Sequence, residues 1–302
     1  MRELYLVHHN RPELLIAQIS ILSKLCPENR INIVLTCDFS SSPLIFREFI
    51  KIINNYKLNY FLSDSNISKF ERYKNKFFAL PHVNLLTLKI PYFRQKFGQD
   101  PSSGHARALD KVLNDSIKKP FGTEVWIIEG DIFPLSNFNL NEMRFDIYGS
   151  VTNIKILNKE YFNGRVFAYR ITPYLKELII RKKLTFKSRH TFFNWFDTGS
   201  LTEKIIKSYK INRKLCIGLM PGLTDSQWKN SDIDRISAIY QGFAELVKKD
   251  TRSKNGNCSF DLYDDMWLHI GKASGYYKFK AEFDFDKFCL EVCDFALNQV
   301  NK

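Results

Sequence analysis

VWIIEGDIFPL, which runs from Val125 to Leu135, is the stretch of the sequence that decides the fold. Its first four residues are apolar and β-prone, which predicts a buried strand. The strand then meets two acids, Glu129 and Asp131, with Gly130 between them. Alternate residues of an extended chain face the same way, so the two carboxylates are expected to lie together.

Two neighbouring carboxylates repel each other unless a proton or a cation intervenes. A hard divalent cation with oxygen ligands removes this repulsion, and such a cation can be shared with a substrate diphosphate. The alternative is a solvated strand end followed by an acidic turn, because Glu-x-Asp alone is a common pattern.

The chain before this strand alternates between predicted strands and helices. The apolar segments expected to be strands are 4–9, 31–37, 58–63 and 84–90, and the helical segments follow Pro12, follow Pro43 and span 103–117. Strands that are apolar throughout and alternate with helices predict an α/β fold with a mostly parallel central sheet flanked by helices. Ligands of such sheets bind beyond the carboxyl ends of the strands, which is where Glu129 and Asp131 are expected.

The second half of the chain is less regular. Strands are expected at 145–151 and 165–171, helices at 173–183, 197–210 and 285–300, a mixed segment at 262–270 and a loop at 248–259. No repeat or linker divides the chain, so we expect a single domain.

The composition narrows the class of protein. The 302 residues are 44% hydrophobic and 25% charged, which is typical of a globular protein that buries a core without disulfides. The net charge of +13 favours anionic partners. The six cysteines show neither C-x-x-C nor zinc-site spacing, which favours free thiols in a reducing compartment. The sequence shows no signal peptide and no apolar run of transmembrane length. Together these observations favour a cytoplasmic location.

Several segments, in order, resemble GT-A glycosyltransferases, closest to the family-2-like enzymes that use nucleotide sugars. VWIIEGDIFPL is similar to their D-x-D strand, and the other segments that carry the resemblance are LYLVHHNRPELL, INIVLTCDFSSS, SSGHARALDKVL and DDMWLHIGKASGY. The resemblance implies a nucleotide-sugar-binding half at 1–150 and an acceptor-binding half at 151–302 of one GT-A domain.

The resemblance also implies a bound Mn²⁺ or Mg²⁺. Asp131 is the safer metal ligand, because the first acid here is Glu129 and not aspartate, and Glu129 alternatively reaches the ribose or sugar. His269 would supply a further ligand, although a histidine in an apolar run can equally be a core residue. Imidazole fits Mn²⁺ better than Mg²⁺.

The nucleotide is expected near the ends of the first two strands. His8, Asn10 and Arg11 follow the first strand, and Asp38 ends the second strand, where the family's acid accepts hydrogen bonds from the base or ribose. Asn10 is also a plausible N-cap for the helix that begins at Pro12.

Other residues are expected beside the donor's phosphates. Gly130 belongs to the acid motif, and Lys272 and Ser274 lie in a loop suited to closing over phosphates. His105 and Arg107 open a predicted helix, whose N–H groups would bind an anion. A solvated Arg107 is the alternative.

An inverting transferase needs a carboxylate base to accept the proton of the acceptor hydroxyl. The candidates are Asp197, Asp264 and Asp265, with Asp197 first because it begins a predicted helix beside two aromatic residues. A retaining mechanism would need no such base.

The sequence therefore predicts a metal-dependent hexosyltransferase. It would move a sugar from a UDP- or GDP-linked donor to a hydroxyl of a glycan, lipid-linked or protein acceptor, with no nucleic-acid partner. The basic 176–214 stretch is either a solvated face or a surface for peripheral membrane contact or for a phosphorylated acceptor. The alternatives are a sugar-nucleotide nucleotidyltransferase and a non-catalytic basic protein that binds nucleic acid or a membrane.

Overall fold

The computed structural model describes residues 1–9, 11–35, 43–62, 101–138, 145–154, 159–181, 184–186, 213–219, 228–250, 260–271 and 284–301. The strand expected at 84–90 and the helix expected at 197–210 lie outside these ranges. The helices are α1 (Pro12–Leu25), α2 (Pro43–Asn55), α6 (Pro101–Ser116), α8 (Pro173–Ile180), α10 (Asn230–Ile239), α11 (Phe243–Lys249) and α12 (Phe285–Val300). The strands are β1 (Arg2–His8), β2 (Arg30–Leu35), β3 (Asn59–Leu62), β4 (Glu124–Glu129), β5 (Ile132–Pro134), β6 (Ile147–Ile154), β7 (Lys159–Arg170), β8 (Arg213–Ile217), β9 (Phe260–Tyr263) and β10 (Trp267–Ile270).

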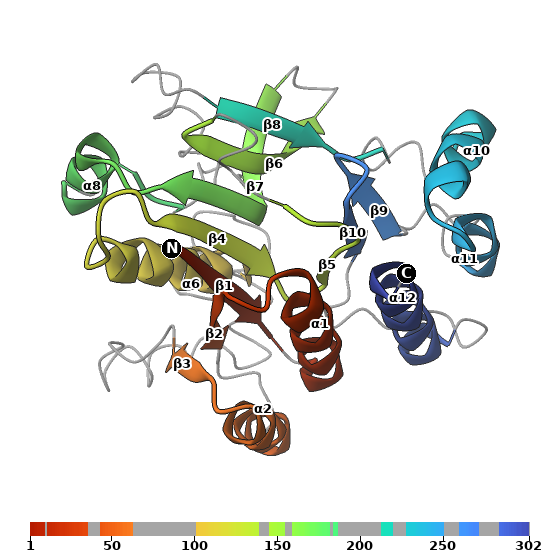
Figure 1. Cartoon of the computed structure of the whole chain (residues 1–302), viewed down its shortest axis with the longest axis horizontal. Coiled ribbons are helices and arrows are strands. Elements are labelled where there is room, and N and C mark those ends of the chain that lie inside the picture. The colour runs from red at the N-terminus through yellow and green to blue at the C-terminus, as the bar shows by residue number, and fades with distance from the viewer. Residues whose placement is uncertain are drawn as a thin grey trace, which may run out of the picture.

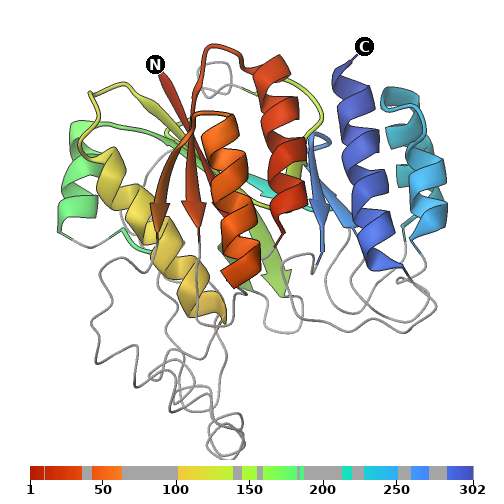
Figure 2. The same cartoon turned by 90° about the horizontal axis from the view of Figure 1, so that it is seen from below.

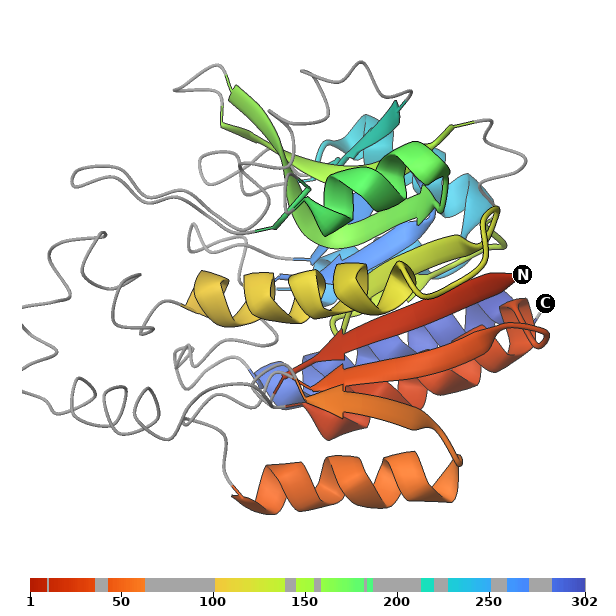
Figure 3. The ribbon, with the colours of Figure 1, turned by 90° about the vertical axis from the view of Figure 1, so that its left-hand side faces the viewer.

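Seven strands form the central sheet in the order β3-β2-β1-β4-β7-β6-β8. All neighbouring pairs are parallel except the two that involve β7, which runs antiparallel to β4 and β6. The predicted α/β class with a mostly parallel central sheet is confirmed. Parallel pairing brings the carboxyl ends of β1, β2 and β4 to one edge of the sheet, and Figure 3 shows these strands pointing the same way.

Both faces of the central sheet are covered (Figure 1). One face packs against α6 and α8, with Tyr5 and Ile127 in that core, and the other packs against α1 and α2, with Leu6 and Trp126 in that core. Figure 2 shows α2, α1 and α12 side by side. Because β4 is buried on both faces, its sequence is a continuous apolar run and not an alternating one.

A second, three-stranded sheet has the order β5-β10-β9. It begins directly after the acid motif, since β5 follows β4 with only Gly130 and Asp131 between them. Its outer side packs against α10, α11 and α12. The sequence analysis did not predict β8, α10 or α11, and it treated the β9–β10 hairpin as one mixed segment.

Three predicted boundaries need correction. Helix α6 begins at Pro101, so His105 and Arg107 lie in its second turn, where backbone N–H groups bond within the helix. They therefore do not form an anion-binding helix start. The cap position of α1 is Arg11 and not Asn10, and it makes no side-chain capping bond. Helix α11 extends to Lys249, into the stretch expected to be a loop.

The described cysteines, at positions 26, 216, 289 and 293, are buried. Cys289 and Cys293 lie on the inward face of α12. Among the described helices, none combines the length and apolarity that a membrane span requires.

The β9–β10 hairpin turns through Asp264 and Asp265, whose φ angles are 53° and 55°. The backbone N–H of Met266 donates to the carbonyl of Tyr263 at 3.0 Å, which closes a two-residue turn. Two successive residues with positive φ are typical of a turn that favours Asn-Gly or Asp-Gly. Aspartate tolerates this conformation but glycine adopts it more readily.

We therefore expect Asp265→Gly to raise the free energy of unfolding by about 0.5–1 kcal/mol, because glycine relieves the positive φ. The lost ion pair with Arg235 is exposed and contributes little. Urea unfolding measures the change. The control is Asp286→Gly in the first turn of α12, where the same replacement should destabilise the protein. A less stable Asp265→Gly variant would contradict the assigned turn.

Candidate functional site

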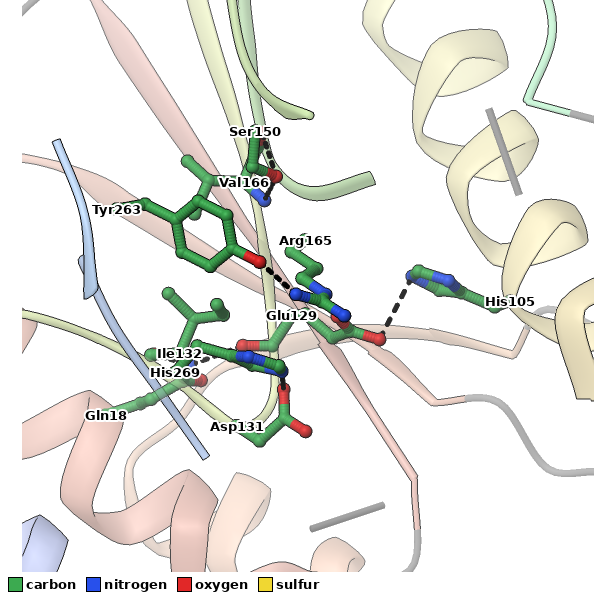
Figure 4. Close-up of polar contacts among 10 residues, drawn as sticks. All are labelled: Gln18, His105, Glu129, Asp131, Ile132, Ser150, Arg165, Val166, Tyr263 and His269. Atoms are coloured by element: carbon green, nitrogen blue, oxygen red, sulfur yellow. Dashed lines mark hydrogen bonds and ion pairs between the residues drawn. The ribbon is translucent and has the colours of Figure 1, made fainter. Parts of the chain in front are cut away.

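Glu129, Asp131 and His269 meet at the carboxyl edge of the central sheet, and we call them the acid cluster. One potential ligand atom from each lies within 4.8 Å of the other two. Glu129 ends β4, Asp131 lies in the turn that follows, and β10 places His269 opposite Ile132. Figure 4 shows the three side chains converging from the two sheets. The structure thus brings together the three predicted metal ligands.

Asp131 is the most deeply buried acid of the cluster, with 3% of its surface exposed. Its Oδ1 lies 3.7 Å from His269 Nε2 and has no hydrogen-bond partner among the residues that the structure describes. Burial raises the pKa of Asp131 well above its usual range, and the charge of Glu129 raises this pKa further, while Arg165 opposes the shift. A buried carboxylate oxygen without a partner is costly, and a cation would remove that cost.

The residues present therefore fit a divalent metal ion. Two carboxylates and one imidazole form a mixed oxygen and nitrogen set that suits Mn²⁺. His105 approaches the same cluster from α6, with its Nε2 3.7 Å from Glu129 Oε1. This places His105 beside the acid cluster although it does not lie at a helix start.

Gln18, a buried side chain on α1, holds the backbone of the acid turn. Its Nε2 donates to the carbonyl of Glu129 at 2.8 Å and to the carbonyl of Ile132 at 2.5 Å. Its Oε1 lies 2.7 Å from Nε2 of His8, so His8 donates from Nε2. The amide thus bonds on both sides of Gly130 and fixes the turn relative to the first helix. The sequence analysis missed Gln18, because a glutamine within an apolar helical pattern carries no motif.

Glycine is required at position 130 because there is no room for a side chain. Its backbone angle does not require glycine, since φ is not positive. A Cβ atom at this position would lie 2.6 Å from Nδ1 of His8. His8 is 1% exposed, so it lies behind the acid turn. This revises the expectation that the His8 side chain lines a nucleotide pocket: it supports the turn through Gln18 and Gly130.

We expect Gly130→Ala to destabilise the protein by about 1–3 kcal/mol and to abolish the Mn²⁺ binding that is expected at the acid cluster, since the new methyl group must displace His8 or the turn. The control is Gly122→Ala. Gly122 has a φ of +81° and open space around it, so alanine should cost stability there without affecting the metal. Thermal unfolding and Mn²⁺ titration separate the two effects, and normal Mn²⁺ affinity in Gly130→Ala would contradict this role.

Burial lowers the pKa of His8 to about 4, and the hydrogen bond with Gln18 opposes this shift only in part. The unfolded chain takes up this proton near its ordinary value of 6.5, so between these pKa values the unfolded state binds more protons. The free energy of unfolding should therefore decrease by roughly 3 kcal/mol as the pH falls from 6.5 to 4. In His8→Gln this contribution disappears. Urea unfolding across this pH range tests it, and an equal pH slope in both proteins would contradict it.

Arg165 and Tyr263 form one wall of the site (Figure 4). Arg165 comes from β7, where its neighbour Val166 pairs with Ile128 of β4, and it donates to the phenolic oxygen of Tyr263. Burial alone would lower the pKa of Arg165, but Tyr263, Glu129, Asp261 and Asp131 outweigh it and raise this pKa. The sequence analysis expected a strand here and did not identify Arg165 as a site residue. Which strand would pair with β4 is a long-range property that no local motif reveals.

Asp264 and Asp265 lie in the hairpin turn, away from the acid cluster. Asp265 is four residues from His269 along the hairpin, which corresponds to about 13 Å of extended chain. Asp264 accepts from Lys214 at 2.7 Å and from the hydroxyl of Tyr148 at 3.2 Å, and Asp265 pairs with Arg235. Both carboxylates are therefore engaged by basic partners around the turn, which does not favour their expected role as a catalytic base.

Two of the other predicted site residues, Arg11 and Arg107, lie within the described part of the chain. Arg11 pairs with Glu13 at 3.0 Å and with Asp286 at 2.6 Å, which ties the start of α1 to α12. Arg107 is a half-buried residue of α6. The remaining predicted site residues, Asn10, Asp38, Asp197, Lys272 and Ser274, lie outside the described residues.

Comparison by sequence finds no match, either to a protein-family model or to a curated protein. Comparison by structure finds distant likenesses. The mannosyltransferase PcManGT from Pyrobaculum calidifontis, in complex with GDP-Man and Mn²⁺, is 11% identical with a TM-score of 0.39, over 99% of this chain and 72% of that one. Residues 1–349 of TarS from S. aureus are 11% identical with a TM-score of 0.36, over 84% and 68%. The galactosyltransferase LgtC, in complex with donor and acceptor sugar analogs, is 9% identical with a TM-score of 0.36, over 97% and 95%.

Proposed function

We propose that this protein is a metal-dependent hexosyltransferase that moves a sugar from a UDP- or GDP-linked donor to an acceptor hydroxyl. The observation that carries the proposal is the acid cluster at the carboxyl edge of a mostly parallel sheet, with a buried Asp131 oxygen that has no hydrogen-bond partner among the described residues. This edge is where sheets of this class bind their ligands.

Asp131, Glu129 and His269 would hold the metal ion, with Asp131 as the principal ligand. The ion would supply positive charge for the diphosphate that leaves the donor sugar. Gln18 and Gly130 keep the turn of Asp131 in place, so the ligands are positioned before the substrate arrives. Such positioning avoids reorganisation during the reaction.

The acceptor side of the site is proposed from the sequence alone. Asp197 is the remaining candidate for the base that takes the hydroxyl's proton, since the described geometry assigns Asp264 and Asp265 to the hairpin turn. The division into halves at residue 150, the glycan, lipid-linked or protein acceptor, the cytoplasmic location and the peripheral membrane contact stay predictions.

Asp131→Asn tests the proposal, because asparagine keeps the shape of the side chain and removes its charge. With Mn²⁺ present, UDP or GDP should raise the melting temperature of the wild-type protein, and this shift should be lost in the variant. Sugar transfer from the matching donor should be lost with it. Without metal, the variant should be at least as stable as the wild type, since it no longer buries an uncompensated carboxylate.

The control is Asp264→Asn, which makes the same chemical change in the hairpin turn. It should keep the Mn²⁺-dependent shift, because Asp264 does not belong to the acid cluster. An Asp131→Asn variant that retains the full nucleotide shift and metal-stimulated transfer would refute the proposed function.

A further inference from the structure

A positive charge, the guanidinium of Arg165, lies beside the acid cluster. We propose that Arg165 is a positioning residue that makes the metal ion and the nucleoside diphosphate bind interdependently: it weakens the metal's affinity for the empty site and strengthens binding of the nucleotide. This inference rests on the proposed function and adds the reason why the two ligands would enter together.

The position of Arg165 is set by the two sheets and not by the ligands. It lies on β7, next to β4, and its guanidinium both donates to Tyr263 and lies over that ring, 5.7 Å from the ring centroid. Tyr263 belongs to β9 of the smaller sheet. Figure 4 shows the guanidinium between Tyr263 and the carboxylate of Glu129. The contact with Tyr263 thus holds the charge of Arg165 beside the acid cluster.

A further carboxylate acts on Arg165 from the side of the smaller sheet. Asp261 is 7% exposed, and its Oδ1 accepts from the backbone N–H of Leu262 at 2.7 Å. A Cβ atom on Gly218 would lie 2.0 Å from Asp261 Oδ2, so glycine at this position leaves room for the carboxylate. Asp261 thus attracts the guanidinium together with Glu129 and Asp131, and Oδ1 of Asp131 has no hydrogen-bond partner among the described residues.

Arg165 would repel the metal ion and attract the diphosphate. A divalent cation beside Glu129 and Asp131 is repelled by the guanidinium, and this repulsion is strong because the surroundings are buried. A diphosphate is attracted by the guanidinium and by the metal together, through charge-assisted contacts. The nucleotide therefore offsets the repulsion that the metal alone would meet.

Arg165→Gln removes the charge and retains N–H donors near Tyr263. We expect it to bind Mn²⁺ about tenfold more tightly than the wild type in the absence of nucleotide, and to bind UDP or GDP about tenfold more weakly at saturating Mn²⁺. Electron paramagnetic resonance of free Mn²⁺ measures the first affinity, and calorimetry measures the second. Arg165→Lys, which keeps the charge, should remain closer to the wild type in both measurements.

The control is Arg235→Gln, which removes an arginine that pairs with Asp265 in the hairpin turn and should change neither affinity. If Arg165 only stabilised the fold, Arg165→Gln would weaken both affinities, and that outcome overturns the inference. Unchanged affinities in Arg165→Gln overturn it as well. A wild-type protein that binds no Mn²⁺ with or without nucleotide would instead refute the proposed function, together with this inference.

Discussion

The buried amide of Gln18 is the interaction on which the arrangement of the site depends. One side chain bonds to the carbonyls on both sides of Gly130 and to His8, so three elements meet at a single group. In a low-dielectric interior, each of these bonds is strong and its loss leaves a buried polar atom unsatisfied. The acid turn is consequently held by α1 and β1, and it does not rely on the ligands for its shape.

The site combines this rigid support with an electrostatic cost. Asp131 is buried beside Glu129, and the charge of Arg165 compensates them only in part. If stability alone were under selection, apolar side chains would be expected at such a position. Local charge conflict at the end of a well-packed strand is therefore an indication of ligand binding, and the surrounding core must supply the stability that the site lacks.

Local patterns of apolar residues predicted those strands and helices in which the order of apolar residues follows from which faces are buried. The apolar run of β4 reflects cover on both of its faces, and the periodic pattern of α12 reflects the single face that it buries. Helix α10 was missed because only Ile236 among its residues is buried, so it has no apolar stripe. In the site, the acids were visible as a motif, whereas Arg165 and Gln18 act through strand pairing and helix packing across long separations. Asp264 and Asp265 resembled a functional pair because aspartate suits both catalysis and positive-φ turns.

The acid motif is also the junction of the two sheets. Glu129 is the last residue of β4 in the seven-stranded sheet, Asp131 lies in the turn that leads to the three-stranded sheet, and His269 lies on β10 of that sheet. An ion bound by all three would therefore join the two sheets and the helices packed on each of them. Occupancy of the site would couple the unfolding of the two sheets. Hydrogen exchange in α12, which packs on the smaller sheet, would then report on a cation held at the end of β4.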